Sequence, residues 1–264
     1  MISLQNITAV DAPGFGFASV DKGDVTVVIP TLNEEKAIEL VIRGLRSEDY
    51  HNILVVDGNS RDETLRIAKR MRVRTATQVG KGKTGAVATA ISLIKTPYFV
   101  LIDGDYTYDP GDIEKLIEKA SEYSHVIGAR AERANIPLFN RFGNSMINLM
   151  FNMYFGSDLR DVCSGLYLIR TSWAKGLVLE SEGFGVEVEL AARSALDKVV
   201  TEVPISYRSR IGMQKLNPIK DGLRIGYTIN LLARKHNVPL YKAVLITGCL
   251  ALLGFSYLLI DNMF

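Results

Sequence analysis

The chain has 264 residues, 47% of them hydrophobic, and a formal net charge of +2 at pH 7. This length allows one large domain or one domain with an appendage, and the small net charge excludes a nucleic-acid-binding polycation, so no nucleic-acid partner is expected. Two cysteines far apart and three scattered histidines match neither a disulfide framework nor a zinc site, which favours a reducing, cytosolic setting.

Short apolar runs mark the strands that we predict in the first half of the chain. Residues 1–23 precede them and lack the basic start and continuous apolar core of a secretory signal, so we interpret them as a peripheral extension. The runs themselves are continuously apolar, which is typical of strands covered on both faces of a parallel sheet. They occupy residues 25–30, 52–57 and 98–103.

Helical patterns separate these runs. The pattern at 34–46 has its apolar residues at helical spacing, and Asn33 is its predicted N-cap. Strand–helix–strand repetition over about 100 residues implies a doubly wound α/β layer. Further helices are predicted at 84–95, 110–122, 140–155 and 187–197, and further strands at 165–170 and 199–207.

Polar side chains follow the predicted strands, where ligands bind in sheets of this class. Thr31, Asn33, Asp57, Asp103 and Asp105 all come just after a strand end. Asp103 and Asp105 are one residue apart and would repel each other unless a cation lay between them. Carboxylate oxygens suit Mg²⁺ or Mn²⁺, which can bridge protein carboxylates and a substrate diphosphate. The pair therefore predicts a divalent-metal site.

The C-terminal part has a different composition. Residues 243–260 contain no charge, and a helix of this length would be about 27 Å long, close to the bilayer core of about 30 Å. We therefore predict a transmembrane helix at 242–261, preceded by a basic amphipathic segment at 213–241 that suits an anionic membrane surface. The excess of Lys and Arg beside the helix predicts a cytoplasmic main domain, held by this single pass or peripherally. Few residues follow the helix, so the chain is either complete or cut before another helix.

Four motifs occur in order at similar intervals: "VVIPTLNEEKAI" (27–38), "VVDGNSRDET" (55–64), "GKGKTGAV" (80–87) and "LIDGDYTYDP" (101–110). With them the chain resembles the family 2 glycosyltransferases, which have the GT-A fold, a Rossmann-like doubly wound mixed sheet. Within that family it resembles the polyprenyl-phosphate sugar synthases of the dolichyl-phosphate mannose or glucose synthase type. The resemblance implies a catalytic domain at 24–212, and four downstream stretches carry it further: "RFGN" (141–144), "DVCSGLYLIR" (161–170), "GFGVEVEL" (183–190) and "RIGMQKLNPIKDGLRI" (210–225).

The resemblance implies a role for individual residues on the donor side. Asp103 and Asp105 would bind the metal, and Thr107 stands where the family often has a Gln, which leaves a third protein ligand open. Lys81 would lie near the nucleotide, the alternative being a solvated turn lysine. The nucleoside pocket would be lined by Pro30, Thr31, Asn33 and Glu34, with Asp57 on the base or ribose.

The resemblance also implies residues for the acceptor and the donor sugar. Arg130 and Arg141 would hold the lipid phosphate, since the planar guanidinium binds phosphate oxygens in pairs. Lys215 would be a further phosphate contact, although Gln214 replaces the usual Ser before it. Arg208 and Arg210 compete for an upstream arginine position, with Arg210 preferred. The donor sugar would face Ser164 and Gly165, with Glu187 or Glu189 near it.

The implied reaction is an in-line displacement with inversion, from a nucleotide sugar to polyprenyl or dolichyl phosphate. A phosphate acceptor is already anionic, so it needs no general base, and catalysis would rest on positioning and on charge stabilisation. "GFGVEVEL" looks closer to the glucose-type branch, which favours a UDP-sugar over GDP-mannose.

Three alternatives stay open. A family 2 enzyme could act on a glycan or lipid hydroxyl and would need a base such as Glu187 or Asp161. A sugar-nucleotide pyrophosphorylase is disfavoured because no G-x-G-T-R-like stretch follows the first strand. A non-catalytic, membrane-anchored scaffold of the same fold is disfavoured by the intact pair of aspartates.

Overall fold

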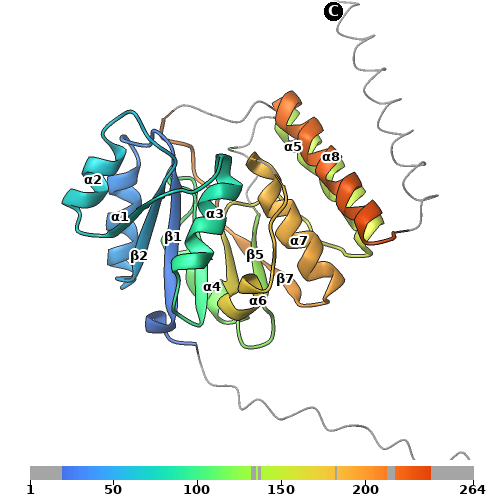
Figure 1. The fold of residues 1–264 in the computed structure, drawn as a ribbon, viewed down its shortest axis with the longest axis horizontal. Helices are drawn as coiled ribbons and strands as arrows, with labels where there is room; N and C mark the ends of the chain where they lie inside the picture. The colour runs from blue at the N-terminus through green and yellow to red at the C-terminus, as the bar shows by residue number, and fades with distance from the viewer. Residues whose placement is uncertain (1–19, 132–134, 136–137, 182, 213–217, 239–264) are drawn as a thin grey trace, which may run out of the picture.

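A seven-stranded mixed sheet organises the part of the chain that the structure describes (Figure 1). The structure is a computed structural model, and the described residues are 20–131, 135, 138–181, 183–212 and 218–238. The strand order is β3-β2-β1-β4-β6-β5-β7, with β6 antiparallel to both of its neighbours and the other pairs parallel. The strands are β1 (Val25–Thr31), β2 (Ile53–Asp57), β3 (Arg74–Thr77), β4 (Tyr98–Leu101), β5 (His125–Arg130), β6 (Tyr167–Arg170) and β7 (Val200–Ile205).

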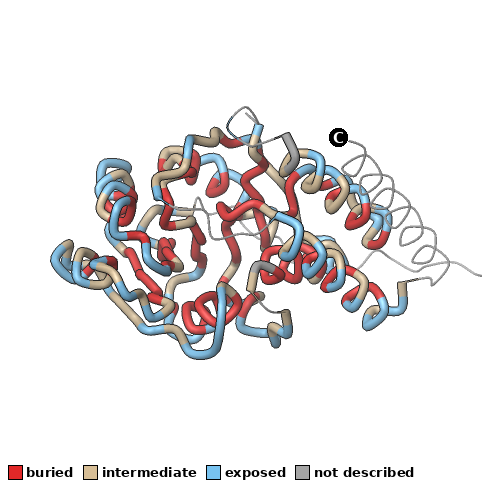
Figure 2. Tube along the Cα trace, turned by 90° about the horizontal axis from the view of Figure 1, so that it is seen from above, coloured by how far each residue is buried: buried red, intermediate tan, exposed pale blue. Residues whose placement is uncertain are grey.

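Helices cover both faces of the sheet, which explains why its central strands are buried almost throughout and mostly apolar. Side chains alternate along β1, so Val25, Val27 and Ile29 pack on one face and Val28 packs on the other. The first face is covered by α1 (Ile38–Ser47), α2 (Thr64–Arg70) and α4 (Ile113–Ile117). The second face is covered by α3 (Gly82–Leu93), α6 (Thr171–Lys175) and α7 (Val186–Leu196). Figure 2 shows the buried strands between the two layers.

Two long helices, α5 (Leu138–Phe155) and α8 (Pro218–Lys235), lie side by side at the end of the sheet that carries β5 and β7. They share a third core cluster with α7, to which Phe151, Val188 and Ile229 belong. The segment predicted to lie at a membrane surface therefore contributes one helix to the folded domain. Within the described residues, no helix has both the length and the apolar character needed to cross a bilayer. The predicted membrane helix at 242–261 lies outside the described residues, as do residues 1–19.

Each predicted strand corresponds to an observed one, but the sequence missed two others. β3 is a short edge strand without a buried residue, and β5 contains a histidine and a glycine, so neither has the expected apolar run. The described residues also contain three short 3₁₀ segments, η1 (Lys22–Asp24), η2 (Pro110–Asp112) and η3 (Gly183–Gly185), of which η2 opens the helix predicted at 110–122 and the other two were not predicted.

The predicted N-cap at Asn33 is wrong, because α1 begins at Ile38. Asn33 adopts a left-handed conformation with φ 53° and joins two loops instead. Its N–H donates to the Ser60 hydroxyl at 2.8 Å, and its side-chain oxygen accepts from the Arg61 N–H at 2.7 Å. Its polar side chain therefore stabilises the edge of the sheet where β1 and β2 end.

Candidate active site

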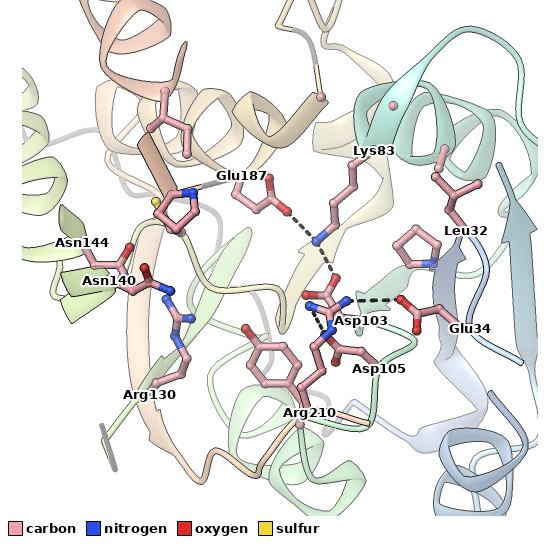
Figure 3. Close-up of a pocket in the computed structure, with 18 of the residues that line it drawn as sticks. Leu32, Glu34, Lys83, Asp103, Asp105, Arg130, Asn140, Asn144, Glu187 and Arg210 are labelled. Carbon is pink, nitrogen blue, oxygen red and sulfur yellow. Dashed lines mark hydrogen bonds and ion pairs between the residues drawn. The ribbon is translucent and has the colours of Figure 1, made fainter. Parts of the chain in front are cut away.

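A cleft of about 560 Å³ opens at the carboxyl ends of β1 and β4 (Figure 3). Its floor comes from these strand ends and from the loop that follows β4. One wall comes from α3 and α7, and another from α5, α8 and the segment after β7. Six ionisable side chains gather at its centre: Glu34, Lys83, Asp103, Asp105, Glu187 and Arg210.

Asp105 is fixed by its own loop. Its Oδ1 accepts hydrogen bonds from the Thr107 N–H at 3.1 Å and from the Thr107 hydroxyl at 2.5 Å. Its Oδ2 lies 3.0 Å from Nη1 of Arg210. Because the Thr107 hydroxyl is engaged with Asp105, this residue orients the carboxylate.

Asp103 is placed by a glycine on the neighbouring chain segment. A Cβ atom at Gly165 would lie 2.0 Å from Oδ2 of Asp103, so only glycine leaves room for this carboxylate. The N–H of Gly165 donates to the Tyr108 hydroxyl at 2.7 Å, which holds the segment in place. Gly165 therefore contributes to the site by leaving room for the Asp103 carboxylate.

Lys83 joins Asp103 to Glu187. Its ammonium nitrogen lies 2.5 Å from Oδ1 of Asp103 and 2.5 Å from Oε1 of Glu187. Burial opposes the charge of Lys83, but the two carboxylates raise its pKa well above the ordinary value. Burial also raises the pKa of both carboxyl groups, against the opposing effect of Lys83. The sequence analysis did not predict a role for Lys83.

Arg210 is paired with two acidic residues, as Lys83 is. Its Nη1 contacts Asp105, and its Nη2 lies 3.3 Å from Oε1 of Glu34. The segment that carries Arg210 is tied to the acidic loop, since the Arg208 N–H donates to the Thr107 carbonyl at 2.8 Å. The Arg208 side chain pairs instead with Asp109 and stacks over Tyr106. Of the two competing arginines, Arg210 is thus the one beside the paired aspartates.

Arg130 lines the cleft nearer to α5 and is bound to Asp161. Its Nε and Nη2 donate to the two carboxylate oxygens of Asp161, each at 2.6 Å, and its guanidinium lies 5.2 Å from the ring centroid of Tyr207. Asp161 also accepts from the Arg130 N–H at 3.1 Å. A ligand phosphate at Arg130 would therefore meet an arginine with fixed orientation.

The structure brings nine of the predicted site residues to the cleft. They are Pro30, Thr31, Glu34, Asp103, Asp105, Arg130, Glu187 and Arg210 in its lining, and Gly165 directly behind Asp103. Thr31 also donates to Asp57 at 3.4 Å, and Asp57 accepts from the Ser60 N–H at 3.0 Å, so Asp57 lies just behind the lining.

The remaining predicted residues that the structure describes are absent from the lining of the cleft. Lys81 is exposed at the start of α3, and Arg141 lies on α5 outside the lining. Ser164 is buried and accepts from the Leu166 N–H. Glu189 is fully buried and accepts from the N–H groups of Glu180 and Ser181, which holds the loop before α7. Lys215 lies outside the described residues.

The paired aspartates fit a divalent cation by their chemistry. Mg²⁺ in proteins is bound by one or two carboxylates together with waters and substrate phosphates. Asp103 and Asp105 can provide the two carboxylates. Among the described residues no group of three or more His, Cys, Asp or Glu could hold a metal by itself.

Comparison with known sequences finds similarity to glycosyltransferases. A family model described as "Glycosyl transferase family 2" matches residues 26–177. Glycosyltransferase AglJ of Haloferax volcanii is 36% identical over 225 residues, which cover 82% of this chain and 74% of that protein. The dolichyl-phosphate hexose transferase of the same organism is 31% identical over 212 residues, which cover 78% of this chain and 92% of that one.

Comparison with solved structures confirms the expected GT-A-like α/β fold. Glucosyl-3-phosphoglycerate synthase from Mycobacterium tuberculosis, in complex with Mn²⁺, UDP-glucose and phosphoglyceric acid, superimposes with a TM-score of 0.63. The alignment covers 79% of each chain at 21% sequence identity, a level that supports the fold alone.

Proposed function

Because the chain belongs to glycosyl transferase family 2, we propose that it transfers a sugar from a nucleotide sugar to the phosphate of a polyprenyl lipid, with inversion at the anomeric carbon. One observation carries the choice of acceptor. Each described carboxylate at the centre of the cleft, and Asp161 beside it, is paired with a cation. An acceptor hydroxyl would need an available base, whereas a phosphate acceptor is already anionic.

The donor would bind between β1 and the paired aspartates. Pro30, Thr31 and Glu34 would line the nucleoside end, and the diphosphate would lie toward Asp103 and Asp105. A divalent cation held by these two carboxylates would offset the charge of the leaving diphosphate as a Lewis acid. Glucosyl-3-phosphoglycerate synthase, which is similar in fold, has been solved with Mn²⁺ and UDP-glucose. We favour a UDP-sugar as the donor.

The protein's own side chains would position the two substrates and stabilise the charge that develops during transfer. Arg130 presents a guanidinium whose direction Asp161 and Tyr207 fix, which suits the acceptor phosphate. Arg210 lies beside Asp105 and would face charge that develops on the donor. The name of the dolichyl-phosphate hexose transferase supports a lipid phosphate as the acceptor.

An apolar surface beside the cleft supports a lipid substrate. α8 exposes Ile219, Leu223, Tyr227 and Leu231 at four-residue spacing, which places them along one face of the helix. The neighbouring α5 exposes Phe142, Leu149 and Met153, and both helices also line the cleft. We propose that this face lies on the membrane, with the catalytic domain in the cytoplasm and residues 242–261 as the anchor.

A second candidate is transfer to a hydroxyl with Glu187 as the base. Its Oε2 is buried without a hydrogen-bond partner among the described residues, and burial raises the pKa of the group. A carboxyl group with a raised pKa is better suited to accept a proton.

The test is a transfer assay on the full chain in membranes, with polyprenyl phosphate and radiolabelled UDP-glucose, UDP-N-acetylglucosamine or GDP-mannose. We expect label in an acid-labile lipid product, dependent on Mg²⁺ or Mn²⁺ and lost in Asp105→Ala. Transfer that requires a glycan or lipid hydroxyl, and that Glu187→Gln abolishes, would favour the second candidate. Full transfer in excess chelator would contradict the metal assignment.

A further inference from the structure

Lys83 is buried in the cleft between two carboxylates, and the proposed reaction assigns it no role. Its side chain is 10% exposed and that of Glu187 is 6% exposed, so the ion pair between them is nearly removed from water. Burying a lysine disfavours its charged form, and a cation in the first turn of α3 also opposes the helix dipole. A lysine retained against both effects needs compensation, which Asp103 and Glu187 supply.

Two glycines allow close packing around the start of α3, which carries Lys83. Gly82 has φ +63°, and a Cβ atom there would lie 2.9 Å from the Cα of Gly183. A Cβ atom at Gly85 would lie 2.8 Å from the Val79 carbonyl oxygen. The missing side chain at Gly82 lets the start of α3 abut the turn that precedes α7, and the missing side chain at Gly85 lets the loop before α3 pack against the helix.

Lys83 and Glu187 retain hydrogen-bonding groups that a ligand could use. The Lys83 ammonium has three N–H donors, and the described contacts to Asp103 and Glu187 use two of them. Glu187 Oε2 is buried without a hydrogen-bond partner in the described part of the chain. Lys83 and Glu187 both line the cleft, so a ligand there can reach these groups.

We propose that Lys83 is the resident counter-ion of Asp103. It holds this carboxylate before the divalent cation binds, releases it to the ion, and then donates to the donor's diphosphate while it stays paired with Glu187. The inference rests on the proposed function, because it requires metal and diphosphate to bind at this edge of the sheet. It assigns Lys83 two opposite effects: competition with the metal alone and attraction of the diphosphate once the metal is bound.

The experiment measures binding rather than turnover, on the purified full chain. Mn²⁺ affinity is measured without nucleotide, from the spin-resonance signal of unbound Mn²⁺, and UDP affinity is measured calorimetrically at saturating Mn²⁺. For Lys83→Met we expect Mn²⁺ to bind at least about tenfold more tightly, because a competing charge a few ångströms away is gone. We expect UDP to bind about tenfold more weakly, because its diphosphate loses a charged donor. Lys83→Arg keeps the charge and should change Mn²⁺ affinity much less.

The controls separate the possible failures. Lys95→Met removes an exposed lysine beyond the other end of α3 and should change neither affinity. If Lys83→Met does not fold, the double variant Lys83→Met/Glu187→Gln is compared with Glu187→Gln. The double variant leaves only Asp103 without the lysine, whereas Lys83→Met leaves both Asp103 and Glu187 without it. Mn²⁺ affinity that is unchanged or weaker without Lys83 would overturn the inference and leave the proposed function intact. A wild-type chain that binds neither Mn²⁺ nor UDP would instead contradict the proposed function.

Discussion

Replacing Gly165 by alanine tests how strictly the fold positions Asp103. The added Cβ would lie 2.0 Å from Oδ2 of Asp103, whereas ordinary contact with a Cβ begins at 3.4 Å. Either the carboxylate or the backbone must therefore move by more than about 1 Å, and misplacement of that size can lower a rate by about 10²-fold. Overpacking of this kind also costs about 1–3 kcal/mol of folding free energy. We expect Gly165→Ala to fold with a lower melting temperature and to lose about 99% of sugar transfer.

The assay combines thermal unfolding with sugar transfer at several Mn²⁺ concentrations. Gly23→Ala is the matched control, because a Cβ atom there meets nothing within 4 Å and activity should be unchanged. A displaced Asp103 should also weaken Mn²⁺ binding, which simple loss of stability would not do below the melting temperature. Wild-type transfer and wild-type Mn²⁺ dependence in Gly165→Ala would refute the positioning argument.

Three further predictions concern Thr107, His125 and the metal. Thr107→Val removes the hydroxyl that bonds Asp105 and should weaken Mn²⁺ binding by about 10-fold or more, with Thr107→Ser restoring it in the same titration. Burial lowers the pKa of His125 to about 3 from 6.5, so as pH falls the unfolded chain binds the proton first. The unfolding free energy should therefore drop by about 2 kcal/mol from pH 8 to pH 5 in urea titrations. His125→Gln should remove that part of the pH dependence, and an unchanged slope would contradict the assignment. Dialysis against EDTA should abolish transfer and added Mn²⁺ should restore it; activity that persists without metal would refute the metal-dependent step.

The acid pair and the central strands could be predicted from the sequence because their signals are local. A strand buried on both faces is apolar at most positions, and β1, β2 and β4 follow this pattern apart from Thr26, Thr31 and Asp57. Two aspartates directly after such a strand lie at the carboxyl edge of the sheet whatever the rest of the chain does. The family followed from four motifs in order, and comparison with known sequences confirmed it.

The tertiary structure alone decided which of two nearby residues reaches the cleft. Lys81 precedes α3 and is exposed, whereas Lys83 lies in its first turn and meets Asp103. Gly82 between them packs closely against Gly183. On α7, Glu187 and Glu189 differ by two positions, about 200° around the helix, so only one of them can face the cleft. That choice depends on packing between segments about a hundred residues apart, and no local pattern encodes it.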